Sequence, residues 1–282
     1  MIELHEAAIV APTHDGEVQV LAPTTLTLAE HRIALIGANG SGKSSLARLL
    51  NGLVLPTSGS VRVRAETRST LPAAGSTSPP EHRWLDTARD GAAVRRQVGF
   101  VFTNPATQLV MPTVIEDVAL SLRRQHPRKA DRLAAAHAAL ARFGLEHLAD
   151  RSVHTLSGGQ QQLLAIASVL AVEPAILIVD EPTTLLDLRN SRRISELLLG
   201  LPQQLIVATH DLELAARCDR VLVIADGRVV PTGGDQTFWV SDSLKSASAI
   251  VETLGQDGVA AEMIAETGGL KLFSLSGFFQ AD

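Results

Sequence analysis

The chain has 282 residues, of which 45% are hydrophobic, and its formal net charge is −5. This composition is ample for a buried core, and the acidic balance gives no overall electrostatic footprint for nucleic acid, so no nucleic-acid partner is expected. The single cysteine, Cys218, excludes an intramolecular disulfide and fits a reducing cytosol. We interpret Cys218 as a small, partly buried hydrophobic residue rather than a reactive thiol.

The N-terminus, MIELHEAAIV, lacks the basic region of a signal peptide. No apolar run reaches the length of about 18 residues that a membrane-spanning helix requires. We therefore expect a soluble chain, which can act at a membrane only by docking on a partner there.

Residues 2–35 alternate short apolar runs with polar turns and predict an antiparallel sheet that leads into the strand RIALIG. After GANGSGKS, four leucines from Leu46 to Leu53 recur at helical spacing, and LPTSGSVRV predicts a returning strand. Residues 66–83 are rich in Pro, Ser, Thr, Gly and Ala, and they predict a flexible surface insertion.

Further along, VRRQVGFVF predicts a strand, and residues 113–147 predict helices with a polar break at RRQHPRK. The runs ILIVDE (176–181) and LIVATHD (205–211) are continuously apolar, which is typical of strands buried on both faces of a parallel sheet. VLVIADGRVV predicts a hairpin that turns at Asp226–Gly227. After about residue 236 no motif is evident, and we expect IVETLGQDGVAAEMI to form one amphipathic helix and GGLKLFSLSGFFQ a pair of strands.

The segment from Gly37 to Ser44, GANGSGKS, matches the phosphate-loop pattern G-x-x-x-x-G-K-[ST], with a strand before it and an amphipathic helix after it. Its glycines let backbone N–H groups wrap phosphate oxygens. We expect Lys43 to reach the β and γ phosphates of a nucleotide and Ser44 to ligate Mg²⁺. The predicted nucleotide-binding residues are Gly37, Ala38, Asn39, Gly40, Ser41, Gly42, Lys43, Ser44 and Ser45.

Two later strands end in polar side chains. ILIVDE ends in two carboxylates, and we expect Asp180 to hold the Mg²⁺ shell through water and Glu181 to orient or deprotonate an attacking water. His210 follows the next apolar strand, where a side chain faces the ligand crevice of a parallel sheet, and it is expected to donate to the γ-phosphate. The predicted catalytic residues are therefore Glu181, His210 and Lys43. The other histidines show no metal-ligand spacing.

Residues 155–162, TLSGGQQQ, place two adjacent glycines directly before the apolar segment LLAIASVLA. A glycine inside a helix costs about 1 kcal/mol relative to alanine, so this pair indicates close backbone approach to a ligand, and a helix start suits a phosphate. The phosphate loop already supplies one complete binding site for a triphosphate. A second phosphate-binding helix start is explained if two subunits pair head to tail. Each subunit would then present Ser157, Gly158, Gly159 and Gln160 to the nucleotide held by its partner.

GANGSGKS, LSGGQ, ILIVDE, TTLLD and ATHD, in this order, resemble the ATP-binding-cassette (ABC) ATPases. The resemblance covers about residues 2–235. It implies an α/β P-loop NTPase fold with a RecA-like core, an antiparallel β-subdomain and a helical signature subdomain at about 103–165. It also implies ATP and Mg²⁺ as cofactors, a dimer with ATP between the subunits, and a place for Asp187 in the loop that crosses the dimer interface. Residues 1–235 form the expected nucleotide-binding domain and 236–282 a C-terminal extension.

A narrower resemblance concerns FTNPATQLVMPTVIEDVALSLRR, which is similar to the segment of energy-coupling-factor (ECF) transporter ATPases that forms a short extra helix near Gln108 and grips the transmembrane coupling protein. LDTARDGAAVRRQVGFVF and VMPTVIEDV resemble the biotin-type members most. The resemblance implies import of a vitamin (biotin first) or of a metal ion through a separate membrane-embedded capture protein. It places the ATPase on the cytoplasmic face of the membrane, beside an identical copy or a homologous ATPase.

Two positions depart from the family pattern. Thr103 stands where the family usually has a glutamine that approaches Mg²⁺ and the attacking water, so a bridging water would have to replace the longer side chain. The chain has no tyrosine, and Ala11 matches the position of the aromatic residue on which the family stacks adenine. Stacking is worth about 1–3 kcal/mol, so modest ATP affinity and loose discrimination against GTP are expected.

Two alternative functions stay open. The first is a soluble ATPase of the same fold that acts in DNA repair or translation, although such relatives usually carry coiled-coil insertions or tandem cassettes, which this sequence lacks. The second is a nucleotide-binding module that has lost hydrolysis, and it is motivated by Thr103 and Ala11.

Overall fold

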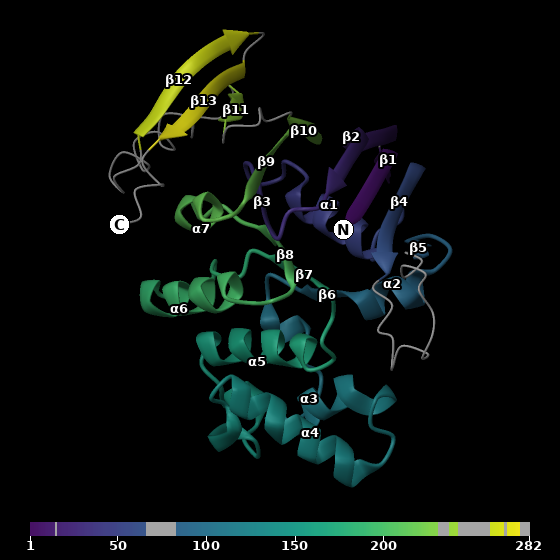
Figure 1. Cartoon of the computed structure of the whole chain (residues 1–282), viewed down its shortest axis with the longest axis vertical. Coiled ribbons are helices and arrows are strands. Elements are labelled where there is room, and N and C mark those ends of the chain that lie inside the picture. Colours follow the sequence, from purple (N-terminus) through teal and green to yellow (C-terminus); the bar gives the residue numbers. More distant parts are fainter. Residues whose placement is uncertain (15, 66–82, 231–236, 242–259, 268–269, 277–282) are drawn as a thin grey trace, which may run out of the picture.

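A computed structural model describes residues 1–14, 16–65, 83–230, 237–241, 260–267 and 270–276. A six-stranded sheet crosses the middle of the molecule, with a second sheet and two helices against one face and a layer of helices against the other (Figure 1). The α/β architecture expected from the sequence, with a parallel core sheet, an antiparallel sheet and a helical layer, is confirmed.

The six-stranded sheet has the order β10-β9-β3-β8-β7-β6, and every neighbouring pair is parallel except β10 and β9. Its inner strands are buried on both faces, as their continuous apolar sequences predict. The six strands are β3 (Arg32–Ile36), β6 (Val98–Val101), β7 (Ile176–Asp180), β8 (Gln204–Ala208), β9 (Arg220–Ala225) and β10 (Arg228–Val230).

Successive residues of each strand join different hydrophobic clusters, because side chains alternate across a sheet. Ile33 and Leu35 of β3 belong to the cluster under the second sheet and helix α1 (Lys43–Asn51). Ala34 and Ile36 belong to the cluster under the helical layer. The sheet is therefore the common wall of two cores.

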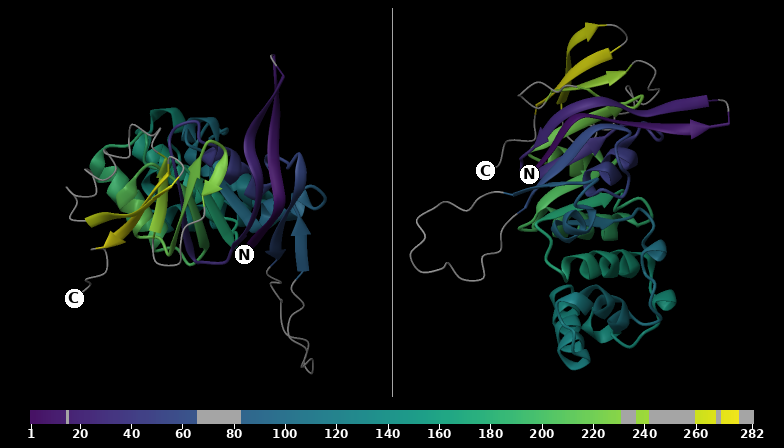
Figure 2. Two further views of the ribbon diagram at one scale, coloured as in Figure 1. Left: turned by 90° about the horizontal axis from the view of Figure 1, so that it is seen from above. Right: turned by 90° about the vertical axis from the view of Figure 1, so that its right-hand side faces the viewer.

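The second sheet is antiparallel and has the order β2-β1-β4-β5. Its first two strands form a long hairpin that extends beyond the body of the protein (Figure 2). Helix α2 (Gly91–Gln97) follows the last strand. The four strands are β1 (Ile2–Thr13), β2 (Gly16–Leu28), β4 (Ser58–Ala65) and β5 (Arg83–Asp86).

The helical layer contains the predicted helices on both sides of the polar break, and the break itself lies at Pro127, between two of them. The helices are α3 (Val114–Ser121), α4 (Lys129–Arg142), α5 (Gly158–Leu170), α6 (Leu188–Leu199) and α7 (Leu212–Ala216). Short 3₁₀ helices connect them at η1 (Pro105–Thr107), η2 (Leu122–Arg124), η3 (Glu146–Leu148) and η4 (Val153–Thr155).

Three sequence predictions for residues 1–235 need correction. The VRRQ part of VRRQVGFVF is the end of helix α2, because Ala, Arg and Gln favour a helix once Gly91 has started it. Leu53 is not on the buried helix face, since Gly52 ends α1 in the left-handed conformation and Leu53 is left exposed. Arg83 belongs to strand β5 rather than to the insertion, whose other residues, 66–82, lie outside the described residues.

The C-terminal prediction is also wrong where it can be compared. Residues 260–264, expected in an amphipathic helix, lie in strand β12 (Ala260–Thr267), and the rest of that segment lies outside the described residues. Of GGLKLFSLSGFFQ the structure describes residues 270–276, which form strand β13 (Leu270–Ser276), and the rest of that segment lies outside the described residues. Strand β13 lies between β12 and β11 (Thr237–Ser241) and is hydrogen-bonded to each, so pairing explains why residues 260–264 are extended. Strand β11 also contacts β9 (Figure 1).

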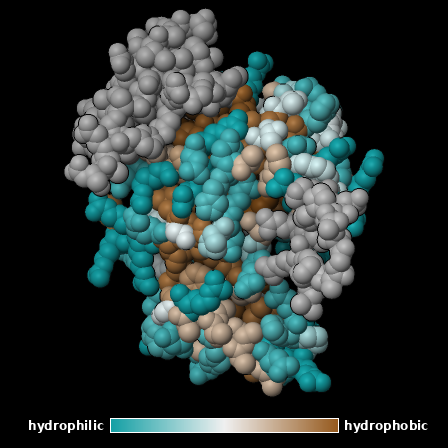
Figure 3. All heavy atoms as spheres, viewed as in Figure 1, coloured by the Kyte–Doolittle hydropathy of each residue, from teal (hydrophilic) through white to brown (hydrophobic). Residues whose placement is uncertain are grey.

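Hydrophilic residues cover much of the face shown in Figure 3, with hydrophobic residues visible between them. Within the described part of the chain, no helix has both the length and the hydropathy needed to cross a bilayer.

Candidate nucleotide-binding site

The phosphate-binding pattern forms the loop between β3 and α1, as predicted. Gly37 has a φ of 152°, and a Cβ atom at this position would overlap the carbonyl oxygen of Ile224 on β9. Gly42 lies in the left-handed region (φ 106°) where α1 begins. A backbone bond from Gly227 N to Ser41 O (3.0 Å) fixes the loop to the β9–β10 turn. These contacts explain why the loop needs glycine at both positions.

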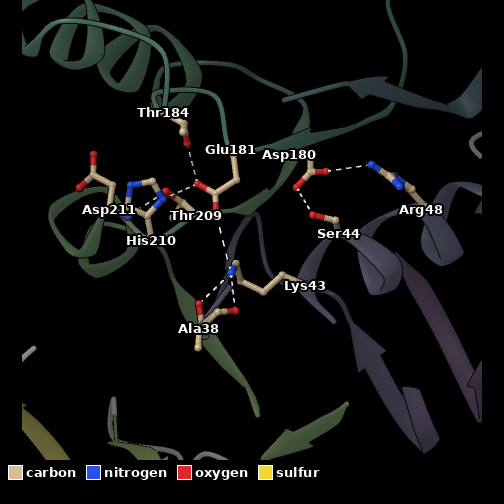
Figure 4. Close-up of polar contacts among 11 residues, drawn as sticks. Ala38, Lys43, Ser44, Arg48, Asp180, Glu181, Thr184, Thr209, His210 and Asp211 are labelled. Carbon is tan, nitrogen blue, oxygen red and sulfur yellow. Dashed lines mark hydrogen bonds and ion pairs between the residues drawn. The ribbon is translucent and has the colours of Figure 1, made fainter. Parts of the chain in front are cut away.

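Lys43, the first residue of α1, points into the loop and is only 5% exposed. Its Nζ donates to Gly37 O (2.7 Å) and Ala38 O (3.1 Å), and lies 3.8 Å from Glu181 Oε1 (Figure 4). Burial lowers the pKa of Lys43, while the nearby carboxylates of Glu181 and Asp180 oppose that shift. The side chain thus supplies a cation at the centre of the loop.

Asp180, at the end of β7, is fully buried and faces α1. Its Oδ1 accepts a hydrogen bond from Ser44 Oγ (2.8 Å). Among the described residues its Oδ2 has no hydrogen-bond partner, and it lies 3.7 Å from Arg48 Nη2. A buried carboxylate oxygen without a donor, next to a serine hydroxyl, is the oxygen-rich donor set that Mg²⁺ prefers, so these two residues fit a magnesium site.

Glu181 follows Asp180 in a left-handed backbone conformation (φ 51°), held by a bond from its N–H to Ala208 O (2.8 Å) on β8. Non-glycine residues rarely adopt this conformation, and such strain is typical of functional sites. The carboxylate Oε2 lies 2.6 Å from His210 Nδ1 and accepts from Thr184 Oγ1 (3.0 Å). His210 is 57% exposed, so its ring links the partly buried Glu181 carboxylate to the open side of the site.

Lys43, Ser44, Glu181 and His210 line one cavity of about 810 Å³. Its polar end is formed by the phosphate loop with Glu181, Thr184 and His210, and Thr103 also lines it. Its apolar wall includes Val20 and Val223. Ala11, the position expected under adenine, is not among the lining residues, and the β1–β2 hairpin contributes Val20 instead.

The LSGGQ segment starts helix α5, as predicted, but none of its residues lines this cavity. Ser157 is the N-cap. Its Oγ accepts from Gln160 N (3.4 Å), while Gln160 Oε1 accepts from Ser157 N (2.9 Å). This reciprocal pair fixes the turn that carries Gly158 and Gly159. Asp187 caps the neighbouring helix α6, and its Oδ1 accepts from Asn190 N (2.8 Å).

The short helix expected near Gln108 is present as η1. The Gln108 side chain itself turns inward. Its Oε1 accepts from Phe102 N (3.1 Å) and its Nε2 donates to Phe100 O (3.3 Å) at the end of β6. Both ends of the amide are therefore used within the chain, where they hold the backbone beside Thr103.

Sequence patterns missed three side chains of the site. Arg48 lies one helical turn after Ser44, and this i, i+4 spacing is a signal that could have found it. Thr184 follows Glu181 by three residues in EPTT, which is a weaker signal. No sequence pattern indicated that Val20 lines the cavity, because its position there depends on where the β1–β2 hairpin packs.

Comparisons with known proteins agree with this arrangement. The ABC transporter family profile matches residues 22–184. The biotin transport ATP-binding protein BioM of Rhizobium etli is 46% identical over 74% of this chain and 84% of its own length. The ECF transporter ATP-binding protein EcfA1 of Levilactobacillus brevis is 39% identical over 76% of this chain and 73% of its own.

Among solved structures, the dimeric post-hydrolysis state of the ATP-binding cassette MJ0796 bound to ADP and Pi is similar, with a TM-score of 0.67 and 27% identity. The match covers 82% of this chain and 97% of that one. This chain has a fold similar to that cassette. It carries a phosphate loop, a strand that ends in the buried Asp180, and a separate helix that begins at LSGGQ. The chain belongs to the ABC transporter family, as an ATP-hydrolysing ATP-binding cassette.

Proposed function

We propose that this ATPase powers solute import through a membrane transporter of the ECF type. The observation that carries the enzymatic part is the convergence of Lys43, Ser44, Glu181 and His210 on one cavity, with Asp180 behind Ser44. The relatives named for biotin transport and for energy coupling support the transport part.

In this proposal the phosphate loop and Lys43 bind the β and γ phosphates of ATP. Ser44 and, through water, Asp180 would hold Mg²⁺, which would supply positive charge against the phosphates. Glu181 accepts the proton of the water that attacks the γ-phosphorus while the bond to ADP breaks. His210 keeps the Glu181 carboxylate in place through the 2.6 Å contact and contacts the γ-phosphate.

A second ATPase, either an identical copy or a homologue, completes each site in this proposal. Its Ser157–Gln160 turn would bind the γ-phosphate through backbone N–H groups at a helix start, and its Asp187 would lie at the interface. The segment around Gln108 would face a transmembrane coupling protein, with Gln108 shaping the segment from inside. The complex would sit on the cytoplasmic face of the membrane.

Replacing Glu181 by glutamine tests the enzymatic assignment. Glu181→Gln keeps the size of the side chain and removes the base, so purified protein should bind ATP and pair while phosphate release falls by at least about a hundredfold. Glu196→Gln is the matched control, because the Glu196 side chain forms an exposed ion pair with Arg217 on the helical layer, away from the nucleotide cavity. Normal turnover by Glu181→Gln would remove Glu181 from its proposed role.

Co-expression with the membrane proteins encoded beside its gene tests the transport assignment. Cells that carry the assembled complex should take up labelled biotin, and uptake should be lost with Glu181→Gln. Uptake of a divalent metal ion or another vitamin instead would change the solute but keep the transporter class. A chain that never co-purifies with a membrane protein would favour a soluble ATPase, and an assembled complex that releases no phosphate would favour a binding module.

A further inference from the structure

The first turn of α6 lies against the first turn of α5, and one side chain, Asn190, contacts both. Both carboxylate oxygens of Asp187 bond to Asn190. The Asn190 N–H donates to Oδ1 (2.8 Å), and the Asn190 Nδ2 donates to Oδ2 (2.8 Å). The bonds from Asn190 lower the pKa of Asp187 and favour its charged form. Asn190 therefore sets the orientation of this carboxylate.

The same amide covers Gly159. A Cβ atom at Gly159 would lie 2.9 Å from Asn190 Cγ, 3.0 Å from its Oδ1 and 3.2 Å from its Nδ2, which is closer than side chains normally approach. Moving the amide away from such a methyl group would disturb its bond to Asp187 Oδ2. By contrast, a Cβ atom at Gly158 would meet only Leu185 O, at an ordinary 3.7 Å. The two glycines of LSGGQ thus have different steric surroundings within their own chain.

We propose that Asn190 is a positioning residue that joins the signature turn and the Asp187 loop into one unit, so that both reach the partner's nucleotide together. This inference rests on the proposed pairing of two ATPases. It assigns the small size of Gly159 a role inside its own chain, in addition to any approach to phosphate. It follows that bulk at Gly159 displaces Asp187 through Asn190.

Alanine substitutions at Gly159 and Asn190, alone and together in the full chain, test this inference. Gly159→Ala should lower kcat by about tenfold, since small displacements of positioned groups are costly to rate, and should leave nucleotide binding to the unpaired chain unchanged. Asn190→Ala removes the three atoms that the methyl group would meet while keeping the backbone bond to Asp187. It should lower kcat less, and the double variant should recover to the level of Asn190→Ala alone.

Gly158→Ala is the matched control, and Asn190→Ala should not rescue it. If the double variant loses kcat by the product of the two single-variant losses, the inference is overturned, because bulk at Gly159 then acts on something other than Asn190. Recovery of kcat in Gly158→Ala when Asn190→Ala is added would overturn the inference as well.

A second readout separates this inference from the proposed pairing. If Glu181→Gln protein fails to pair with ATP, the proposed function fails, and the contact is then tested in the unpaired chain by thermal unfolding. Gly159→Ala should lower the Tm, and Asn190→Ala should remove that decrease. Additive decreases in Tm would refute the contact whatever the state of assembly.

Discussion

Asp117 is a buried carboxylate on α3 that lies outside the nucleotide cavity, and its replacement gives a sharp stability prediction. The residue is 5% exposed. Its Oδ1 accepts from the backbone N–H groups of Val110 (2.9 Å) and Met111 (3.1 Å), and its Oδ2 accepts from Ser168 Oγ (3.1 Å) on α5. Asp117 thus connects the loop after η1 with the helix that begins at the LSGGQ turn.

Asp117→Ala removes all three acceptor contacts. Each unsatisfied buried polar group costs about 1–3 kcal/mol, and Val110 is 67% exposed, so water can satisfy part of its backbone and the lower end of that range applies. The expected loss is about 3 kcal/mol of the free energy of unfolding, or a decrease of about 6–9 °C in Tm for a chain of this size.

Asp117→Asn is the matched variant. Its amide oxygen can accept from both backbone N–H groups while its NH₂ donates to the Ser168 hydroxyl, which accepts as readily as it donates. Only the charge is lost, so the expected cost is under about 1.5 kcal/mol. Urea and thermal unfolding of the full chain measure both variants. An Asn variant as unstable as the Ala variant, or an Ala variant within about 1 kcal/mol of the parent chain, would refute this account.

Other predictions concern the nucleotide site and the cysteine. Thr103→Gln should raise steady-state kcat in the paired protein, because the longer side chain reaches farther into the cavity; unchanged or lower turnover would contradict this. Val20 and Val223 offer no aromatic ring to a base, so titrations should give ATP and GTP affinities within about tenfold, given the 1–3 kcal/mol that stacking supplies. Sub-micromolar ATP binding with strong rejection of GTP would contradict that expectation. Burial raises the pKa of Cys218 to about 12, so a thiol reagent at pH 8 should label it only after unfolding. Because the unfolded thiol loses its proton near pH 9 and the folded one near pH 12, this group should lower the free energy of unfolding as pH rises between these values.

The sequence predicted the parts of the site whose chemistry lies in contiguous residues. RIALIGANGSGKS and ILIVDE each combine a strand with the polar residues at its end, and parallel strands bring those ends to one edge of the sheet. The pairing of Ser44 with Asp180, 136 positions away, follows from that rule. Cys218, interpreted from the sequence as a small, partly buried hydrophobic residue, is buried.

The contacts that the sequence did not predict depend on how separate elements pack. Val20 replaces Ala11 at the cavity because the hairpin's path over the phosphate loop decides which residue faces it. Asn190 meets Gly159 because α5 and α6 begin side by side, and no spacing in either segment encodes that distance. The C-terminal helix prediction failed for a related reason, since pairing with β13 determines the conformation of residues 260–264.

The packing of α5 explains why a single chain should not complete its own catalytic centre. Helix α5 carries the LSGGQ turn at its start, while Leu164 and Ile166 further along it are completely buried in the helical core. Burial of each such side chain contributes about 1.5–3 kcal/mol, so turning this helix toward the chain's own phosphate loop would sacrifice several times the energy of one hydrogen bond. In the proposed pairing, a second chain would supply an LSGGQ turn without disturbing that core. Its Gly158 and Gly159 would approach the nucleotide as they stand, held by Ser157, Gln160 and the packed helix behind them.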